Sequence, residues 1–302
     1  MGAQYWTPRS DNNDDFRQKL VKSGKLVPFE ENEIALDPYK GTVKTHWVCP
    51  DGKGFRAVVE HLLEGTLTKL STHVESFEVL DAKRIQVTTS EGKEEVVNEL
   101  VLTCPIPNVL SILNKSTSFH VAPEIVRALE RVTYSQRFAA AYVFDEKAVA
   151  TVQELGWTAK YVPGDESDVI RFVCWDHLKK RAGEKTLPSL IVHTSVDFGS
   201  TFMNDTRDND EILTVITNAL RKMLPSLPAE QDARLHRWRI SQVWVPYRDP
   251  SIADGDDPVS ALVLSTNPRI IVAGDSFLGS GFDNCLESAK TAANLLQKTS
   301  AL

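Results

Sequence analysis

The chain has 302 residues, of which 42% are apolar, and a formal net charge of −7. This length and apolar content suffice for one large globular domain or two moderate ones. The acidic balance and the lack of a basic stripe exclude nucleic acid as an expected partner, because nothing in the sequence would neutralise its phosphates.

The first part of the chain predicts one helix and then short strands. Residues 11–24 begin with acidic side chains, continue with lysines and end at Gly24, which is the order typical of a helix. Residues 26–48 read as short strands separated by turns. After a turn at residues 50–54, apolar residues recur at helical spacing from Phe55 onwards. Three strand-like segments then predict a β-meander that feeds a buried strand: residues 68–74, residues 77–80 with 84–88, and residues 96–104.

The middle of the chain has a different character, because strands and helices follow one another without β–α alternation. A short amphipathic helix is predicted at residues 123–131 and a long one at residues 208–224, where Pro225 ends it. Four strands are predicted, at residues 135–144, 169–175, 189–194 and 234–245. This order is typical of an α+β domain inserted between two parts of an α/β domain.

The C-terminal segment holds the most informative pattern. A β-branched run that begins at Ile270 ends in Gly274 and Asp275, and a glycine-rich loop and a helix rich in small residues follow. Cofactors in α/β sheets bind at the carboxyl ends of strands. Asp275 therefore stands where its carboxylate would accept a hydrogen bond from a sugar or ribityl hydroxyl. The alternative is that Gly274, Gly279 and Gly281 serve turns without a ligand.

Other classes of site find less support in the sequence. The four cysteines are scattered without a C-x-x-C pair or a histidine at ligand spacing, so free thiols and no metal site are expected. A serine hydrolase would need a second glycine where Leu278 stands. The most apolar segment, residues 100–113, is short and contains two prolines. Without a signal peptide either, a cytoplasmic protein away from membranes is expected.

The C-terminal pattern resembles the signature of FAD-dependent amine-oxidase-type flavoproteins. Three further segments are similar to that family: residues 2–5 (GAQY) beside the flavin ring, His73-Val74 at a strand end near the adenine, and residues 100–105 (LVLTCP) near the dinucleotide. The order of these motifs from Gly2 to Leu296 resembles the renalase branch of the family. The resemblance implies FAD as the cofactor, held by Gly2, Ala3, Gln4, Val74, Thr103, Gly274, Asp275, Gly281, Phe282 and Asp283.

The implied reaction is oxidation of isomeric dihydro-NAD(P) by hydride transfer to the flavin, with O2 as acceptor and H2O2 released. The partners would be this dinucleotide and O2, and no catalytic side chain is assigned. The protein would supply an aromatic slot, with Arg171, Arg239 or His193 near the polar edge of a ligand. The residues proposed as its walls are Tyr5, Trp238, Trp244 and Phe277. Core roles are the alternative for the two tryptophans and for His193.

The resemblance also implies an architecture. We expect an α/β cofactor domain, with a parallel sheet and a β-meander, at residues 1–10, 48–112 and 262–302. An α+β substrate domain on a mixed or antiparallel sheet would comprise residues 11–47 and 113–261. The chain starts without the βαβ unit whose glycine-rich turn binds pyrophosphate, so weak FAD binding or poor solubility is expected of this form. The alternative functions are a flavin monoamine or polyamine oxidase, and a truncated isoform that no longer binds FAD.

Overall fold

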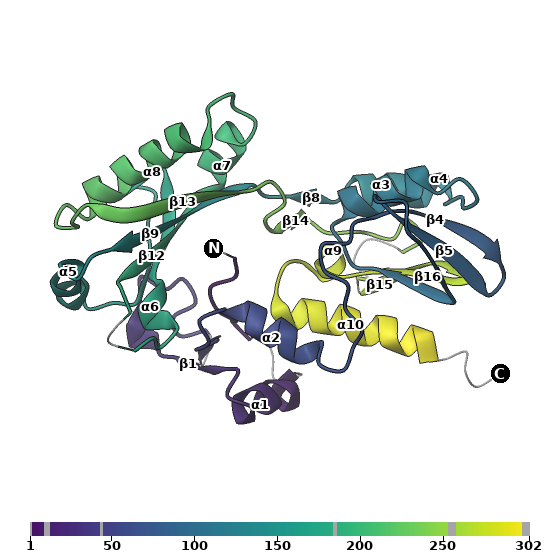
Figure 1. Ribbon diagram of the computed structural model, residues 1–302, viewed down its shortest axis with the longest axis horizontal. Helices are drawn as coiled ribbons and strands as arrows, with labels where there is room; N and C mark the ends of the chain where they lie inside the picture. Colours follow the sequence, from purple (N-terminus) through teal and green to yellow (C-terminus); the bar gives the residue numbers. More distant parts are fainter. Residues whose placement is uncertain (1, 9–12, 43–44, 184–185, 253–257, 298–302) are drawn as a thin grey trace. The chain divides into compact units, whose positions relative to one another are not determined.

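The computed structural model describes residues 2–8, 13–42, 45–183, 186–252 and 258–297 (Figure 1). Within it the chain forms two compact units, each with its own sheets and its own hydrophobic core. Unit 1 comprises Met1–Thr66 and Ser135–Ser241, and unit 2 comprises Leu67–Tyr134 and Gln242–Leu302.

Unit 1 is built on a six-stranded sheet with the order β13-β9-β12-β11-β10-β2. Its strands pair antiparallel, except that β10 and β2 are parallel. The expected mixed sheet is therefore present. Its strands are β2 (Ile34–Ala35), β9 (Arg137–Phe144), β10 (Ala159–Tyr161), β11 (Ile170–Trp175), β12 (Ser189–Thr194) and β13 (Glu230–Trp238). A separate two-stranded sheet joins β1 (Val27–Phe29) and β3 (His46–Val48).

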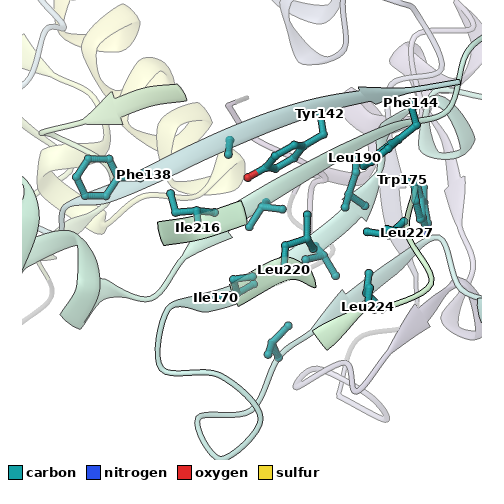
Figure 2. Close-up of a cluster of buried hydrophobic side chains, with 14 of the residues drawn as sticks. Phe138, Tyr142, Phe144, Ile170, Trp175, Leu190, Ile216, Leu220, Leu224 and Leu227 are labelled. Carbon is teal, nitrogen blue, oxygen red and sulfur yellow. The ribbon is translucent and has the colours of Figure 1, made fainter. Parts of the chain in front are cut away.

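One face of the six-stranded sheet carries the main core of unit 1 (Figure 2). Helix α8 covers this face. Its first turn is capped by the Asp208 carboxylate in a capping box with Glu211. Its buried residues Ile212, Ile216 and Leu220 recur every four positions, so they lie on the side of the helix that packs against the sheet. The unit 1 helices are α1 (Asp14–Lys22), α2 (Phe55–Leu62), α5 (Ala148–Leu155), α6 (Asp176–Lys179), α7 (Val196–Phe202) and α8 (Asn209–Met223), with a 3-10 turn η2 (Glu31–Glu33).

Unit 2 contains two three-stranded sheets and a short strand pair. In the first sheet β16 lies between β7, to which it is parallel, and β15, to which it is antiparallel. This sheet consists of β7 (Glu99–Leu102), β15 (Ala261–Thr266) and β16 (Arg269–Ala273). The second is the meander β4 (Val74–Asp81), β5 (Arg84–Thr89) and β6 (Glu94–Val97), and the pair is β8 (Thr133–Tyr134) with β14 (Val243–Val245). The helices are α3 (Ile106–Lys115), α4 (Pro123–Glu130), α9 (Asp275–Leu278) and α10 (Phe282–Gln297).

Three strand predictions need correction. The segment at residues 68–74 is not a strand, because Val74 is the first residue of β4 and pairs with Thr89. The predicted strand at residues 96–104 is broken at Asn98, whose side chain donates a hydrogen bond to the Lys83 carbonyl at 2.9 Å. The chain there leaves the meander for the other sheet. The predicted strand at residues 234–245 is two strands, β13 and β14, which lie in different units.

The unit boundaries also differ from the expected domain boundaries. Residues 2–8 and 48–66 lie in unit 1, and residues 113–134, 242–252 and 258–261 lie in unit 2. One reason is that Trp6 and Trp47 exchange two backbone hydrogen bonds of 2.8 Å, which holds the N-terminal segment beside β3. The cofactor and substrate roles given to the segments stay predictions.

A parallel sheet was expected in the cofactor domain, and β7 and β16, which lie in segments assigned to that domain, do pair in parallel. Helix α3 was not predicted, although Pro107 in its first turn favours a helix start. Within the described ranges, no helix combines the length and the apolar character needed to cross a bilayer.

Candidate functional site

The carboxyl ends of β7 and β16 lie side by side in unit 2. Val272 is the register partner of Leu102, so Thr103 and Gly274 follow the two strands at the same edge of the sheet. Gly274 has a φ of +127°, and a Cβ there would lie 3.4 Å from the Thr103 carbonyl oxygen. Only glycine adopts this backbone readily. The structure thus brings two of the predicted cofactor residues together at the position where α/β sheets bind ligands.

Asp275 begins α9 directly after this edge. Its Oδ2 accepts a hydrogen bond from the Ser280 hydroxyl at 2.8 Å, and Ser280 Oγ in turn accepts one from the Val243 amide. Within the part of the chain that the structure describes, Asp275 Oδ1 accepts no hydrogen bond. The side chain is partly exposed, so this oxygen is free to accept a ligand hydroxyl.

The glycine loop after Asp275 is held by side chains that the sequence analysis did not single out. The Asn284 amide donates to the carbonyls of Leu278 and Gly279, at 2.7 and 3.0 Å. Ser288 is fully buried, accepts a hydrogen bond from the Gly274 amide at 2.7 Å and donates one to the Ser260 carbonyl. The sequence signalled only Asn284, which lies three positions after Gly281, whereas Ser288 is fourteen positions from the Gly274 amide that it binds.

The remaining cofactor candidates of unit 2 divide between two places. Gly281, Phe282 and Asp283 lie at the start of α10, directly after the glycine loop, and Asp283 is buried. Gly279 has a φ of +94°, as a turn requires, whereas Gly281 has no positive φ. Val74 lies in the meander as the first residue of β4 and not, as predicted, at the carboxyl end of a strand. It is the register partner of Thr89, and the hydrogen bond beside this pair joins the Ser90 amide to the His73 carbonyl at 2.9 Å.

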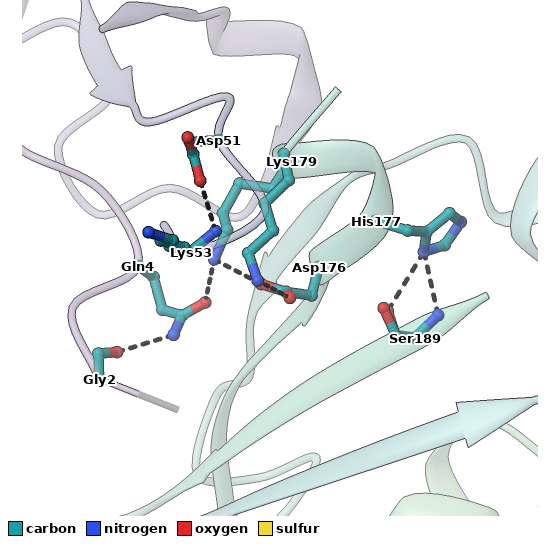
Figure 3. A network of polar contacts seen from close by, with 9 residues as sticks. Gly2, Gln4, Asp51, Lys53, Asp176, His177, Lys179 and Ser189 are labelled. Carbon is teal, nitrogen blue, oxygen red and sulfur yellow. Dashed lines mark hydrogen bonds and ion pairs between the residues drawn. The ribbon is translucent and has the colours of Figure 1, made fainter. Parts of the chain in front are cut away.

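Gln4 is held by a polar network in unit 1 (Figure 3). Its amide nitrogen donates to the Gly2 carbonyl at 2.7 Å, and its amide oxygen accepts from Lys179 Nζ at 2.6 Å. Lys179 is 4% exposed and also pairs with Asp176 at 2.9 Å. Because the Gln4 side chain is occupied by these contacts, the exposed backbone of Gly2 and Ala3 is what this segment offers a ligand.

Tyr5 stands in an aromatic group on the second face of the six-stranded sheet. Its ring centroid is 5.0 Å from His46, 5.9 Å from Phe29 and 6.1 Å from Phe172. Its hydroxyl is hydrogen-bonded to that of Tyr161. Burial, reinforced by the neighbouring Tyr161, raises the pKa of Tyr5, so its hydroxyl stays neutral.

The other predicted pocket walls lie in different surroundings. Trp238 packs edge-on against His236, with ring centroids 4.4 Å apart, and His193 lies 5.9 Å from Phe172; all four are in unit 1. Phe277 is completely buried in the core of unit 2. Trp244, also in unit 2, is 69% exposed. In a single strand at residues 234–245, as predicted, the two tryptophans would share a face; the break after Trp238 shows that they do not belong to one strand.

Comparison with known proteins decides the family. A family model described as flavin containing amine oxidoreductase matches residues 31–297. The chain belongs to this family. Renalase from Mus musculus is 24% identical over 304 aligned residues, which cover 99% of this chain and 83% of the mouse protein.

Solved structures share the fold. A protein from Exiguobacterium sp. 255-15, named for protoporphyrinogen oxidase activity, has a TM-score of 0.59 and 19% identity, over 84% of this chain and 53% of that one. Putrescine oxidase bound to putrescine has a TM-score of 0.57 and 12% identity, over 85% and 55%. The chain therefore spans about half the length of the solved proteins it matches. The predicted fold class is confirmed.

Family membership also confirms FAD as the cofactor and flavin-dependent oxidation as the class of chemistry, both at the level of the family. The edge formed by Thr103, Gly274 and Asp275 fits a flavin dinucleotide. The glycine removes a side chain at the closest approach of the two strands, and the carboxylate keeps one oxygen for a hydroxyl. These residues, with the loop that Asn284 and Ser288 hold, are our candidates for cofactor contacts.

Proposed function

We propose that this chain is an FAD-dependent oxidase of isomeric dihydro-NAD(P). The overall reaction converts the dihydro isomer, O2 and a proton to NAD(P)+ and H2O2. FAD, when bound, would supply the hydride acceptor and the route of the electrons to O2. The tasks that fall to the side chains are to hold the dihydropyridine ring flat, keep water away and orient the rest of the substrate.

The observation that carries this proposal is a row of rings on the second face of the unit 1 sheet. His236, His193, Phe172 and Tyr161 are linked by strand register through the small Ala139, so they share one face. Tyr5 packs on the same face against Phe172. Tyr161 and His193 are partly exposed and His236 is exposed, so these rings are accessible to a ligand. Aromatic rings stack on a planar, neutral heterocycle at centroid distances of about 4.5–7 Å.

The ordered likeness to mouse renalase over 99% of the chain supports the same proposal. The alternative substrates, simple amines, are protonated near neutral pH. Arg137 is on the same face, two positions from Ala139, and Arg171 lies within electrostatic reach of Arg137 and Tyr161. Both cations would repel a protonated amine. The geometry therefore favours the dinucleotide over the amine.

The test uses the full chain reconstituted with FAD under anaerobic conditions. We expect rapid loss of the visible flavin absorbance with 2- or 6-dihydro isomers of NAD(P)H, and slow loss with a monoamine or putrescine. After O2 is admitted, H2O2 should appear in proportion to the isomer consumed. Fast bleaching by an amine, with none by the isomers, would replace the proposal by an amine oxidase.

Retention of FAD distinguishes the proposed oxidase from the alternative of a truncated isoform that no longer binds the cofactor. A protein that stays colourless after incubation with FAD and gel filtration would be the isoform that no longer binds the cofactor. A yellow protein that neither the isomers nor the amines reduce would also contradict the proposed oxidase.

A further inference from the structure

Lys179 is a buried cation of unit 1 to which the sequence analysis gave no role. It is the last residue of α6, which follows the core strand β11 directly, and it is only 4% exposed. Its Nζ pairs with Asp176 at 2.9 Å and donates a hydrogen bond to the amide oxygen of Gln4 at 2.6 Å (Figure 3). Burying an ammonium group is costly unless its charge and its N–H donors find partners.

The charge of Asp176 does not explain why a second lysine is buried beside it. Lys180 Nζ already pairs with the other carboxylate oxygen of Asp176, at 2.6 Å, and the Lys180 side chain is 23% exposed. One carboxylate therefore meets two ammonium groups, of which the more deeply buried one is the more costly to desolvate. Among the described residues, the contact that distinguishes Lys179 from Lys180 is the hydrogen bond to Gln4.

The Gln4 side chain connects Lys179 to the backbone of the N-terminal segment. Its amide nitrogen donates to the Gly2 carbonyl at 2.7 Å, so the side chain folds back over Ala3. The amide is thus used at both ends, with its oxygen toward Lys179 and its nitrogen toward Gly2, and this fixes its orientation. The backbone of Gly2 and Ala3 is held by these contacts while both residues stay exposed.

The exposed backbone lies next to one of the predicted pocket walls. A Cβ on Gly2 would be 3.9 Å from Cζ2 of Trp238, which is ordinary van der Waals contact. The paired backbone hydrogen bonds between Trp6 and Trp47 anchor the same segment at a second point. Backbone N–H and C=O groups recognise the polar edge of a ring well when they are held in place before the ring binds. The segment has this property, and the family resemblance places it beside the flavin ring.

We propose that Lys179 is a positioning residue for the flavin: through Gln4 it fixes the exposed backbone of Gly2 and Ala3 where that backbone contacts the flavin ring. The proposal rests on the proposed function for the presence of FAD and not for the substrate. Groups that touch a ligand are oriented by the hydrogen bonds behind them, so loss of the Lys179 contact weakens flavin binding although Lys179 itself does not touch the ring.

The first experiment compares the two lysines that share Asp176. FAD affinity and the visible absorption spectrum of the bound flavin are measured for the full-length wild type, Lys179→Met and Lys180→Met. Methionine has a similar length but no ammonium group, and in either variant Asp176 keeps one lysine. We expect Lys179→Met to bind FAD about 10-fold more weakly, as for the loss of one hydrogen bond to a charged group. Its bound-flavin spectrum should approach that of free FAD in water, whereas Lys180→Met should match the wild type in both measurements.

The outcomes that overturn the proposal are distinct from those that overturn the oxidase. Equal FAD affinity and equal spectra in the wild type and Lys179→Met would overturn the positioning role. Equal losses in Lys179→Met and Lys180→Met would assign the effect to the charge of Asp176 and would also overturn it. If the variants behave as expected but no dihydro isomer reduces the flavin, the positioning role stands and the proposed oxidase falls. A wild type that takes up no FAD would contradict both.

A second variant separates positioning from a purely structural role and serves also if Lys179→Met does not fold. Gln4→Glu has nearly the same shape and keeps an oxygen for Lys179, beside which its carboxyl stays ionised. It has no N–H to donate to the Gly2 carbonyl. We expect this variant to fold, as judged by urea denaturation followed by circular dichroism, and to show the weaker FAD binding and the altered spectrum of Lys179→Met. Wild-type FAD affinity and a wild-type spectrum in Gln4→Glu would show that Gly2 is not positioned through Gln4 and would contradict the proposal.

Discussion

At the scale of single residues, Asp275 is the side chain on which the cofactor site most depends. We predict that Asp275→Ala lowers FAD affinity by about 10- to 100-fold, because it removes a carboxylate acceptor worth roughly 1.5–3 kcal/mol. Trp238→Ala should lower it less, since that ring, which packs beside His236, offers a ligand no carboxylate acceptor. Flavin absorbance after gel filtration at a series of FAD concentrations measures both.

Ser280→Ala is the control for this experiment, because it removes the hydroxyl that donates to Asp275 Oδ2 and leaves the carboxylate in place. If Ser280→Ala loses as much flavin as Asp275→Ala, the carboxylate acts only by holding the loop. Flavin content equal to that of the wild type in Asp275→Ala would remove Asp275 from the site.

At the scale of elements, the close approach of α7 to β9 fixes one side of the core in unit 1. A Cβ on Gly199 would lie 2.0 Å from the Gln136 carbonyl oxygen and 2.9 Å from Arg137 Cα. Backbone atoms cannot move aside as a flexible side chain does. The helix N-cap Ser195, whose Oγ accepts from the Phe198 amide at 3.1 Å, holds this end of α7 in place.

We therefore predict that Gly199→Ala destabilises the chain by about 3 kcal/mol or more, at the upper end of overpacking effects. Gly164→Ala is the matched control, because nothing lies within 4 Å of a Cβ there and its φ is not positive. Urea denaturation followed by circular dichroism should show a lower midpoint for Gly199→Ala alone. Equal midpoints for the two variants would show that α7 can withdraw from β9 at little cost.

At the scale of the whole molecule, partly buried ion pairs make the free energy of unfolding depend on pH. Burial alone would raise the pKa of Asp176, but Lys179 and Lys180 outweigh it, and the pKa is lowered. The pKa of Glu33 is lowered in the same way. Burial alone would raise it, but the Arg181 guanidinium donates hydrogen bonds of 2.5 and 2.8 Å to the two Glu33 carboxylate oxygens. The folded state therefore binds fewer protons than the unfolded chain at these groups.

A carboxyl group whose pKa is lower in the folded state stabilises that state fully at pH values above its pKa in the unfolded chain, about 4. This stabilisation is lost as the pH falls through the pKa of the folded state. We predict that the free energy of unfolding of the wild type declines below about pH 5. Asp176→Asn should be less stable near pH 7, by about 1–3 kcal/mol, and should have a flatter acid profile. Replacement of the exposed Asp165 by Asn should change neither quantity. An acid profile of Asp176→Asn parallel to that of the wild type would contradict this account.

The sequence by itself predicted those features that depend on neighbours along the chain. Helix α8 follows from a capping box and a four-residue apolar period within residues 208–224. The strand that ends in Gly274 and Asp275 follows from a β-branched run and its glycines. The family resemblance rested on the order of such local motifs.

Only the tertiary structure decided what depends on partners far apart in the sequence. Gln4 and Lys179 are 175 positions apart, and their contact places the side chain of a predicted cofactor residue in a buried polar network. The break at Asn98 depends on a carbonyl in the preceding hairpin, and Phe172 and His193 share a face with Ala139 only because of strand register. Local periodicity fixes which way a side chain points along its own strand. Which strands lie beside it is decided by the burial of apolar surface over the whole unit.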